Sequence, residues 1–74
     1  MTQKQMYEQC VQLAPDFRLG LEFPVLGRSL VWHGTPRGSL VSLTAGVLFP
    51  PTNPVEPLLD YLLNQALVTL QQAV

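Results

Sequence analysis

The alternation of apolar and polar side chains is clearest in the middle of the chain, where it predicts a β-hairpin. Two strand-like runs, 28–34 and 39–49, flank the segment 35–38, whose sequence is TPRG. Proline in the second position and glycine in the last position favour a type I turn that ends in a left-handed residue. With this turn we expect His33 to lie opposite Val41.

This pairing assigns every hairpin residue to one face of the sheet, because side chains alternate along a strand. We expect two helices to cover the face formed by Phe17, Leu19, Leu21, Phe23, Val31, Val41, Leu43 and Val47. The residues expected on the other, uncovered face are Arg28, Leu30, Leu40, Trp32, Ser42 and Thr44. A connection one residue longer or shorter would reverse one strand against the other, so the assignment depends on the turn.

The first third of the chain predicts a helix over about 3–14 and a strand over about 16–23. Thr2 and Gln5 have the spacing of a capping box, and apolar residues then recur every three or four positions until Pro15. Phenylalanine and leucine next alternate with polar residues, as in a strand with one buried face. The segment PVLG at 24–27 predicts a short reversal into the hairpin.

A proline-rich connector after residue 49 ends the sheet, and a helix is expected over about 55–73. Its apolar band comprises Leu59, Leu62, Leu63, Ala66, Leu67, Leu70 and Val74. The band is wider than one sheet face needs, so we expect part of it to contact a second subunit. The predicted fold is a single α+β domain in the order αβββα, with a three-stranded antiparallel meander and both helices on one face.

Composition supports association with another chain. The 74 residues form one small domain, and a core of this size seldom supplies more than roughly 3–5 kcal/mol of stability. With 47% hydrophobic and only 12% charged residues, we expect some apolar surface to meet a partner. We therefore expect a homodimer or a complex with another protein.

Several other classes are disfavoured by the same counts. One cysteine, Cys10, and one histidine, His33, are too few for a disulfide or a closed zinc site within the chain. A net charge of −1 argues against a nucleic-acid partner. Asn64 and Gln65 interrupt the last apolar stretch, which argues against a membrane span, and the lone thiol with no apolar leader suggests the cytoplasm.

The sequence contains no specific catalytic signature, so we expect neither an enzyme nor a cofactor nor a metal. His33 could activate the hydroxyl of Ser39 or Thr35 near the turn, but no carboxylate is evidently placed to orient it. A small hydrolase or transferase that uses His33 is therefore the weakest alternative. Arg37 at the turn tip could bind an anion, although an exposed turn arginine is more often only solvated, and Cys10 is expected to be a buried thiol.

Trp32 is the most informative residue for function. On an uncovered face with two leucines and an arginine rim it would have the composition of an interface centre. We therefore predict a non-enzymatic protein–protein interaction module, homodimeric through this sheet face, the last helix or both. If the helices cover this face instead, Trp32 belongs to the core. The alternative function is a small-molecule or anion-binding domain with a pocket between sheet and helices, contacted by Trp32, Arg28 and His33.

Overall fold

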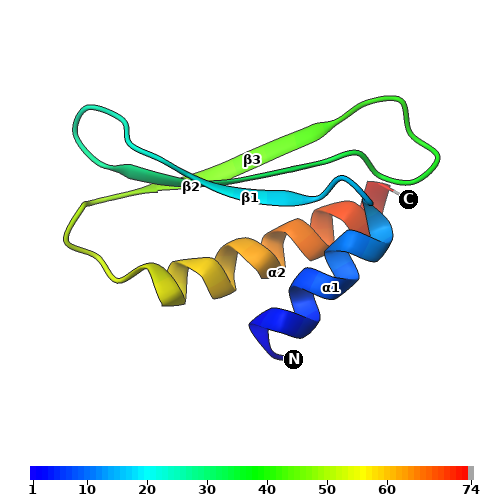
Figure 1. The fold of residues 1–74 in the computed structure, drawn as a ribbon, viewed down its shortest axis with the longest axis horizontal. Helices are drawn as coiled ribbons and strands as arrows, with labels where there is room; N and C mark the ends of the chain where they lie inside the picture. Colours follow the sequence, from blue (N-terminus) through cyan, green and yellow to red (C-terminus); the bar gives the residue numbers. More distant parts are fainter. Residues whose placement is uncertain (74) are drawn as a thin grey trace.

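A computed structural model describes residues 1–73 of the chain. The elements follow the order α1 (Gln3–Leu13), β1 (Arg18–Glu22), β2 (Arg28–Gly34), β3 (Leu43–Phe49) and α2 (Val55–Ala73). The strands form one antiparallel sheet in the order β1-β2-β3, and both helices lie on the same side of it (Figure 1). The predicted α+β fold is confirmed. Val74, expected to close the apolar band of α2, lies outside the described residues.

The predicted start of α1 is confirmed in its hydrogen bonds. The Gln5 backbone N–H donates to Thr2 Oγ1 at 3.2 Å, and the Thr2 N–H donates to Gln5 Oε1 at 2.8 Å. This capping box pairs donors that the first turn of a helix leaves free. Beyond Leu13 the N–H of Ala14 still donates to Cys10 O, and Pro15 follows.

The reversal between β1 and β2 also forms where the sequence predicts it. The Gly27 N–H donates to Pro24 O at 3.2 Å, which closes a four-residue turn. The strands then pair so that Leu19 lies opposite Trp32 and Leu21 lies opposite Leu30. These four side chains therefore share the face that points toward the helices.

The predicted register of the β2–β3 hairpin is wrong. His33 lies opposite Thr44, three positions beyond the expected Val41, and β3 begins only at Leu43. A shift by an odd number of positions exchanges the faces of β2 relative to β3. Leu30 and Trp32 thus lie on the helix side of the sheet, while Val31 and His33 lie on the outer face, away from the helices.

The reason for the long connection is that it leaves the sheet and docks on the end of α1. The backbone N–H and the hydroxyl of Thr35 donate to the two carboxylate oxygens of Asp16, at 2.7 and 2.8 Å. The Arg37 N–H donates to Leu13 O at 2.9 Å, and Arg37 Nε donates to Gln12 O at 2.6 Å. The two bonds from Arg37 cap carbonyls in the last turn of α1 that the helix itself cannot pair.

The tight turn in this connection forms one residue later than expected. The Ser39 N–H donates to Pro36 O at 3.0 Å, and Gly38 has a φ of 79°, the left-handed conformation that glycine tolerates. Pro36 is fully buried, whereas Leu40 and Val41 just beyond the turn are exposed. The turn residues were therefore correctly recognised, but the strand does not resume directly after them.

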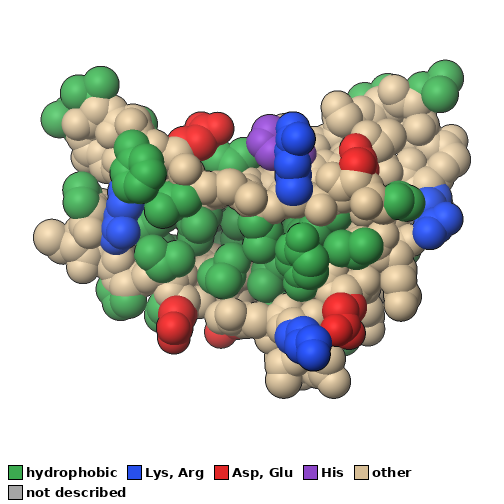
Figure 2. Space-filling view, in the orientation of Figure 1, with side chains coloured by type: hydrophobic (Ala, Val, Ile, Leu, Met, Phe, Trp, Pro, Cys, Tyr) green, Lys and Arg blue, Asp and Glu red, His purple; other side chains and the backbone are tan. Residues whose placement is uncertain are grey.

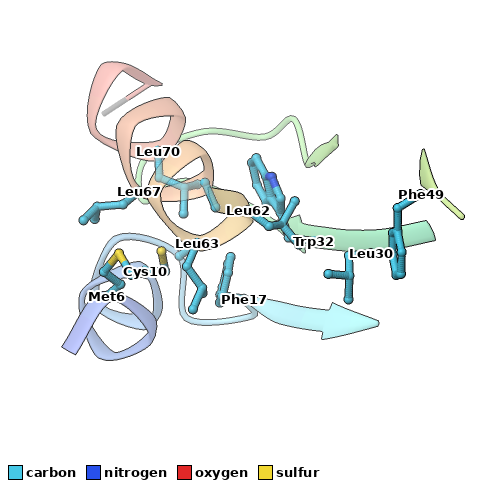
Figure 3. Close-up of a cluster of buried hydrophobic side chains, with 12 residues drawn as sticks. Met6, Cys10, Phe17, Leu30, Trp32, Phe49, Leu62, Leu63, Leu67 and Leu70 are labelled. Atoms are coloured by element: carbon cyan, nitrogen blue, oxygen red, sulfur yellow. The ribbon is translucent and has the colours of Figure 1, made fainter. Parts of the chain in front are cut away.

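The core lies between the sheet and α2, with α1 packed along α2. Trp32 is only 1% exposed, and its ring lies 6.0 Å from that of Phe17 (Figure 3). Phe17 in turn makes an edge contact of 5.4 Å with the Tyr7 ring of α1. Trp32 and Leu30 are thus core residues, which corrects their predicted place on an uncovered face.

The other residues of this buried cluster come mainly from the two helices. They are Met6, Cys10, Ala14, Phe49, Leu62, Leu63, Ala66, Leu67 and Leu70. On the side shown in Figure 2, hydrophobic side chains continue to the surface between the sheet and α2. Within residues 1–73, neither helix is long and apolar enough to cross a membrane.

Candidate functional site

The six residues predicted to form an interface are not brought together. Leu30 and Trp32 are buried, Leu40 and Ser42 lie in the exposed connection before β3, and Thr44 lies on the outer face. Arg28 lies beside Phe49 at the far end of the sheet. The interface hypothesis therefore loses the centre that the sequence suggested.

Arg28 fastens the connector that follows β3. One of its guanidinium nitrogens, Nη2, donates to Pro51 O and to Asn53 O, each at 2.7 Å, and the guanidinium carbon lies 4.8 Å from the centre of the Phe49 ring. Arg28 Nε is enclosed and has no partner among the described residues. Arg28 is thus committed to holding the chain between β3 and α2, as Arg37 is to capping α1.

The outer face carries His33 in a row with Arg18 and Thr44. His33 Nδ1 lies 2.9 Å from Thr44 Oγ1, a hydrogen bond whose direction depends on the tautomer. Within residues 1–73, no carboxylate is hydrogen-bonded to this ring. Ser39 and Thr35, the hydroxyls considered from sequence, bond instead to Val41 and Asp16. The hydroxyl that His33 meets is thus that of Thr44, which the sequence did not suggest, and among the described residues no carboxylate orients the ring.

Exposed apolar side chains stand at both ends of this outer face. They are Phe23, Val25 and Leu26 in the β1–β2 turn, and Leu40 and Val41 in the β2–β3 connection. Both connections rise above the sheet, so the molecule has a concave outline on this side (Figure 2). The two groups are separated by the length of the sheet.

The outer edge of β3 is a second candidate surface. Each of the edge strands β1 and β3 has one strand neighbour within residues 1–73. Thr44, Ala45, Gly46 and Leu48 are exposed, and the sequence of β3, LTAGVLF, contains neither a charge nor a proline. Such a strand presents unpaired backbone N–H and C=O groups to any chain that can align with it.

A pocket of about 200 Å³ lies directly beside this edge, between β3 and α2. Its walls are Trp32, Ala45, Gly46, Val47, Tyr61, Leu62, Gln65 and Thr69. A pocket between sheet and helices was the alternative prediction, and Trp32 does line it. Arg28 and His33, the other contacts expected from sequence, do not.

The exposed stripe of α2 continues the same surface beyond the pocket. Tyr61 is 54% exposed, and Gln65, Val68 and Thr69 follow it along the same side of the helix. The chain carries no charged residue after Asp60. We call the combined surface of Ala45, Gly46, Val47, Tyr61, Gln65, Val68 and Thr69 the β3–α2 flank. Sequence reasoning expected a contact on the last helix but, with β3 in the wrong register, did not combine it with this edge.

Cys10 does not belong to any of these surfaces. The side chain is fully buried where α1 packs on α2, and burial raises the pKa of its thiol from 9.0 to about 11. A thiol is a poor nucleophile when so little of it is ionised. The prediction of a buried structural cysteine is confirmed.

Comparison with known proteins adds no relative to this description. Neither a protein-family model, nor a curated protein, nor a solved structure matches the chain.

Proposed function

We propose that this protein is a non-enzymatic protein–protein interaction module that forms a homodimer through the β3–α2 flank. The observation that carries this proposal is the edge of β3, seven residues long, apolar and exposed along most of its length. Natural proteins usually protect a sheet edge with charges, prolines, bulges or a covering segment. An edge without the first two of these devices is suited to pairing with another strand.

The strand is also suited to pairing with a copy of itself. Residues directly opposite each other in a sheet share a face, and a twofold axis perpendicular to the sheet keeps each residue on the same face in both copies. In an antiparallel pair of identical strands, one residue must therefore lie opposite its own copy, at the twofold axis. Pairing all of Leu43–Phe49 places Gly46 on that axis. Ala45 then lies opposite the partner's Val47, so a small side chain faces a larger one on the helix side of the joined sheet.

The exposed stripe of α2 supports the same arrangement. In such a dimer the two α2 helices run side by side beneath the joined sheet, and each presents Tyr61, Gln65 and Val68 to the other. Depletion of charge at the centre and enrichment of aromatic residues are typical of interfaces. The added contact also supplies support that a core of this size seldom provides alone.

The proposal is tested by the solution mass of charge variants at Ala45. This residue is exposed and lies one position from the proposed axis, so Ala45→Glu brings two carboxylates close together across the dimer. We expect the wild type to be dimeric by light scattering, and Ala45→Glu and Ala45→Lys each to be monomeric. An equimolar mixture of the two variants should dimerise again, because opposite charges then meet at the same place.

The matched control is Gly20→Glu on the other edge of the sheet. A Cβ added at Gly20 has no described neighbour within 4 Å, so the variant adds the same charge without a steric penalty. It should remain dimeric. A monomeric wild type, or a mixture that stays monomeric, would overturn the proposal.

We place this module in the cytoplasm and propose no catalytic role for His33. A lone buried thiol is suited to a reducing compartment. A net charge of −1 supports a protein partner over a nucleic acid.

A further inference from the structure

The pocket beside β3 contains a polar group that the fold itself does not use. The Trp32 side chain is 99% buried, yet its indole N–H donates to no acceptor in the hydrogen bonds of the described side chains. Among those residues, the side-chain nitrogen that is fully enclosed and without a hydrogen-bond partner is Arg28 Nε. The Trp32 indole nitrogen also has no partner but is thus not fully enclosed, and the residue lines the pocket. Figure 3 shows the nitrogen on the side of the ring away from Phe17.

We propose that this pocket binds a small neutral molecule that places a hydrogen-bond acceptor on the Trp32 indole N–H and an apolar frame against the surrounding walls. Buried indole N–H groups in proteins usually have a partner. Ligand sites commonly combine mainly apolar walls with a few polar groups that fix orientation. The Trp32 indole supplies such a group at the inner wall.

The walls determine the chemical class of the ligand. Ala45, Val47 and Leu62 are apolar, and Tyr61 adds an aromatic ring at the surface. None of the described residues that line the pocket is charged. An anion would be buried without a counter-charge at a large desolvation cost, so a ketone, amide or ether is favoured over a carboxylate or phosphate.

Two further side chains set the polar end. The Thr69 hydroxyl already donates to Gln65 O at 2.7 Å, so it can accept a hydrogen bond only from a ligand that also donates, such as an amide. That bond uses the Gln65 backbone carbonyl; the Gln65 side-chain amide has no hydrogen-bond partner within residues 1–73 and can turn toward a bound molecule. The volume of about 200 Å³ is sufficient for a six-membered ring, since an apolar cavity of ~150 Å³ already binds benzene.

This inference does not require the proposed dimer, but the two share a surface, because six of the seven residues of the β3–α2 flank also line the pocket. Pairing through β3 would narrow the pocket mouth. The partner's Ala45 and Val47 carry no side-chain acceptor for the indole N–H, whereas the partner's Gln65 does, so the shift with cyclohexanone is measured on the monomeric Ala45→Glu variant as well as on the wild type. The two hypotheses are therefore tested on the same sample by different measurements, the indole resonance for the ligand and the solution mass for the dimer.

The probe for the test is cyclohexanone, followed by NMR on isotope-labelled protein. Trp32 is the only tryptophan, so the spectrum contains a single indole N–H resonance. We expect cyclohexanone to move this resonance downfield in a saturable manner, as an acceptor reaches the N–H. Cyclohexane, which lacks the acceptor, should cause no downfield shift, and cyclohexanecarboxylate should not bind.

A blocking variant ties the signal to the pocket. Thr69→Leu places extra carbon atoms inside the pocket and should weaken cyclohexanone binding by at least about tenfold. Gln72→Leu, one turn further along α2 and outside the pocket, should leave the binding unchanged within about twofold. A titration with no saturable shift would overturn the inference, as would equal downfield shifts with cyclohexane or undiminished binding to Thr69→Leu. A monomeric mass with a saturable shift would overturn the dimer alone.

Discussion

The two edge strands of the sheet differ in how each is protected against pairing. β1 has five residues and carries Arg18 at one end and Glu22 at the other, whereas β3 has seven residues and no charge. Charges on an edge strand discourage a second chain from aligning with it, because pairing would desolvate them. The edge of β1 is thus protected against pairing by its charges, whereas the edge of β3 is suited to pairing with another strand.

The packing between the sheet and the helices also differs between the two edges. On the β1 side, the rings of Tyr7, Phe17 and Trp32 follow one another from α1 into the core. On the β3 side, the small residues Ala45 and Gly46 leave the pocket unfilled. The filled side contributes to the stability of the single chain, and the unfilled side offers room for a ligand or a neighbouring subunit.

The largest expected effect comes from removing the residue that lies between both edges. Trp32 pairs with Leu19 of β1 and with Ala45 of β3. Replacing a buried tryptophan with a small residue costs about 3–5 kcal/mol. That is comparable to the roughly 3–5 kcal/mol that a core of this size supplies, so Trp32→Ser should be unfolded. Circular dichroism and urea denaturation measure this, and a folded, native-like variant would contradict the core position of Trp32.

Alanine substitutions at one glycine in each edge should have opposite signs. An ideal Cβ at Gly46 lies 2.6 Å from Leu30 O, closer than atoms can approach, so β3 or β2 must shift. Gly46→Ala should cost about 1–3 kcal/mol. Gly20 of β1 has open space at that position among the described residues, so Gly20→Ala should stabilise by about 0.4–1 kcal/mol. Urea midpoints give both values, and equal effects at the two positions would contradict the register of β3.

The face of Trp32 is the point at which sequence reasoning failed, and the cause is physical. Periodicity predicted both helices and the order of the three strands, because local caps, turns and apolar faces indicate each of them, but it did not predict where β3 begins. In β2, however, Leu30, Val31 and Trp32 are consecutive and all apolar, so alternation alone does not say which face is buried. The predicted face of Trp32 therefore depended on the assumed length of the connection between β2 and β3.

That length is set by contacts distant in sequence. Asp16 and the end of α1 hold Thr35 and Arg37, and these contacts delay the start of β3 to Leu43. The turn signal at Gly38 is genuine but does not report where pairing resumes. A pocket between sheet and helices was the alternative prediction, but apart from Trp32 its walls could not be predicted, since they come together only in the observed register.

A smaller difference is expected between the two arginines that fasten opposite ends of the sheet. Arg28 donates to two backbone carbonyls and stacks on Phe49 beside β3, whereas the Arg37 side chain donates to one carbonyl at the end of α1. Methionine retains the apolar stem but removes the donors. Arg28→Met should cost about 1–2 kcal/mol and Arg37→Met about 0.5–1 kcal/mol, as measured by urea denaturation. The opposite order would show that the cap on α1 matters more than the connector clamp.

The smallest effect concerns the pH dependence of the contact next to β1. Hydrogen bonds from the Thr35 backbone N–H and hydroxyl lower the pKa of Asp16 below its ordinary 3.8. A carboxyl group with a lowered folded-state pKa contributes stability that is complete above the unfolded value and is lost as pH falls through the folded value. The loss of wild-type stability between about pH 5 and about pH 2 should therefore be larger than in Asp16→Asn, which does not titrate.

Glu22→Gln at the other end of β1 is the control, because in residues 1–73 this side chain accepts no comparable hydrogen bonds. It should lose as much stability as the wild type over the same pH interval. If Asp16→Asn and Glu22→Gln both retained the wild-type pH dependence, the Asp16–Thr35 contact would not be formed in solution. Nothing at Thr35 would then hold the β2–β3 connection away from the sheet. The connection could shorten, and the observed register of β3 against β2 would no longer be explained by this contact.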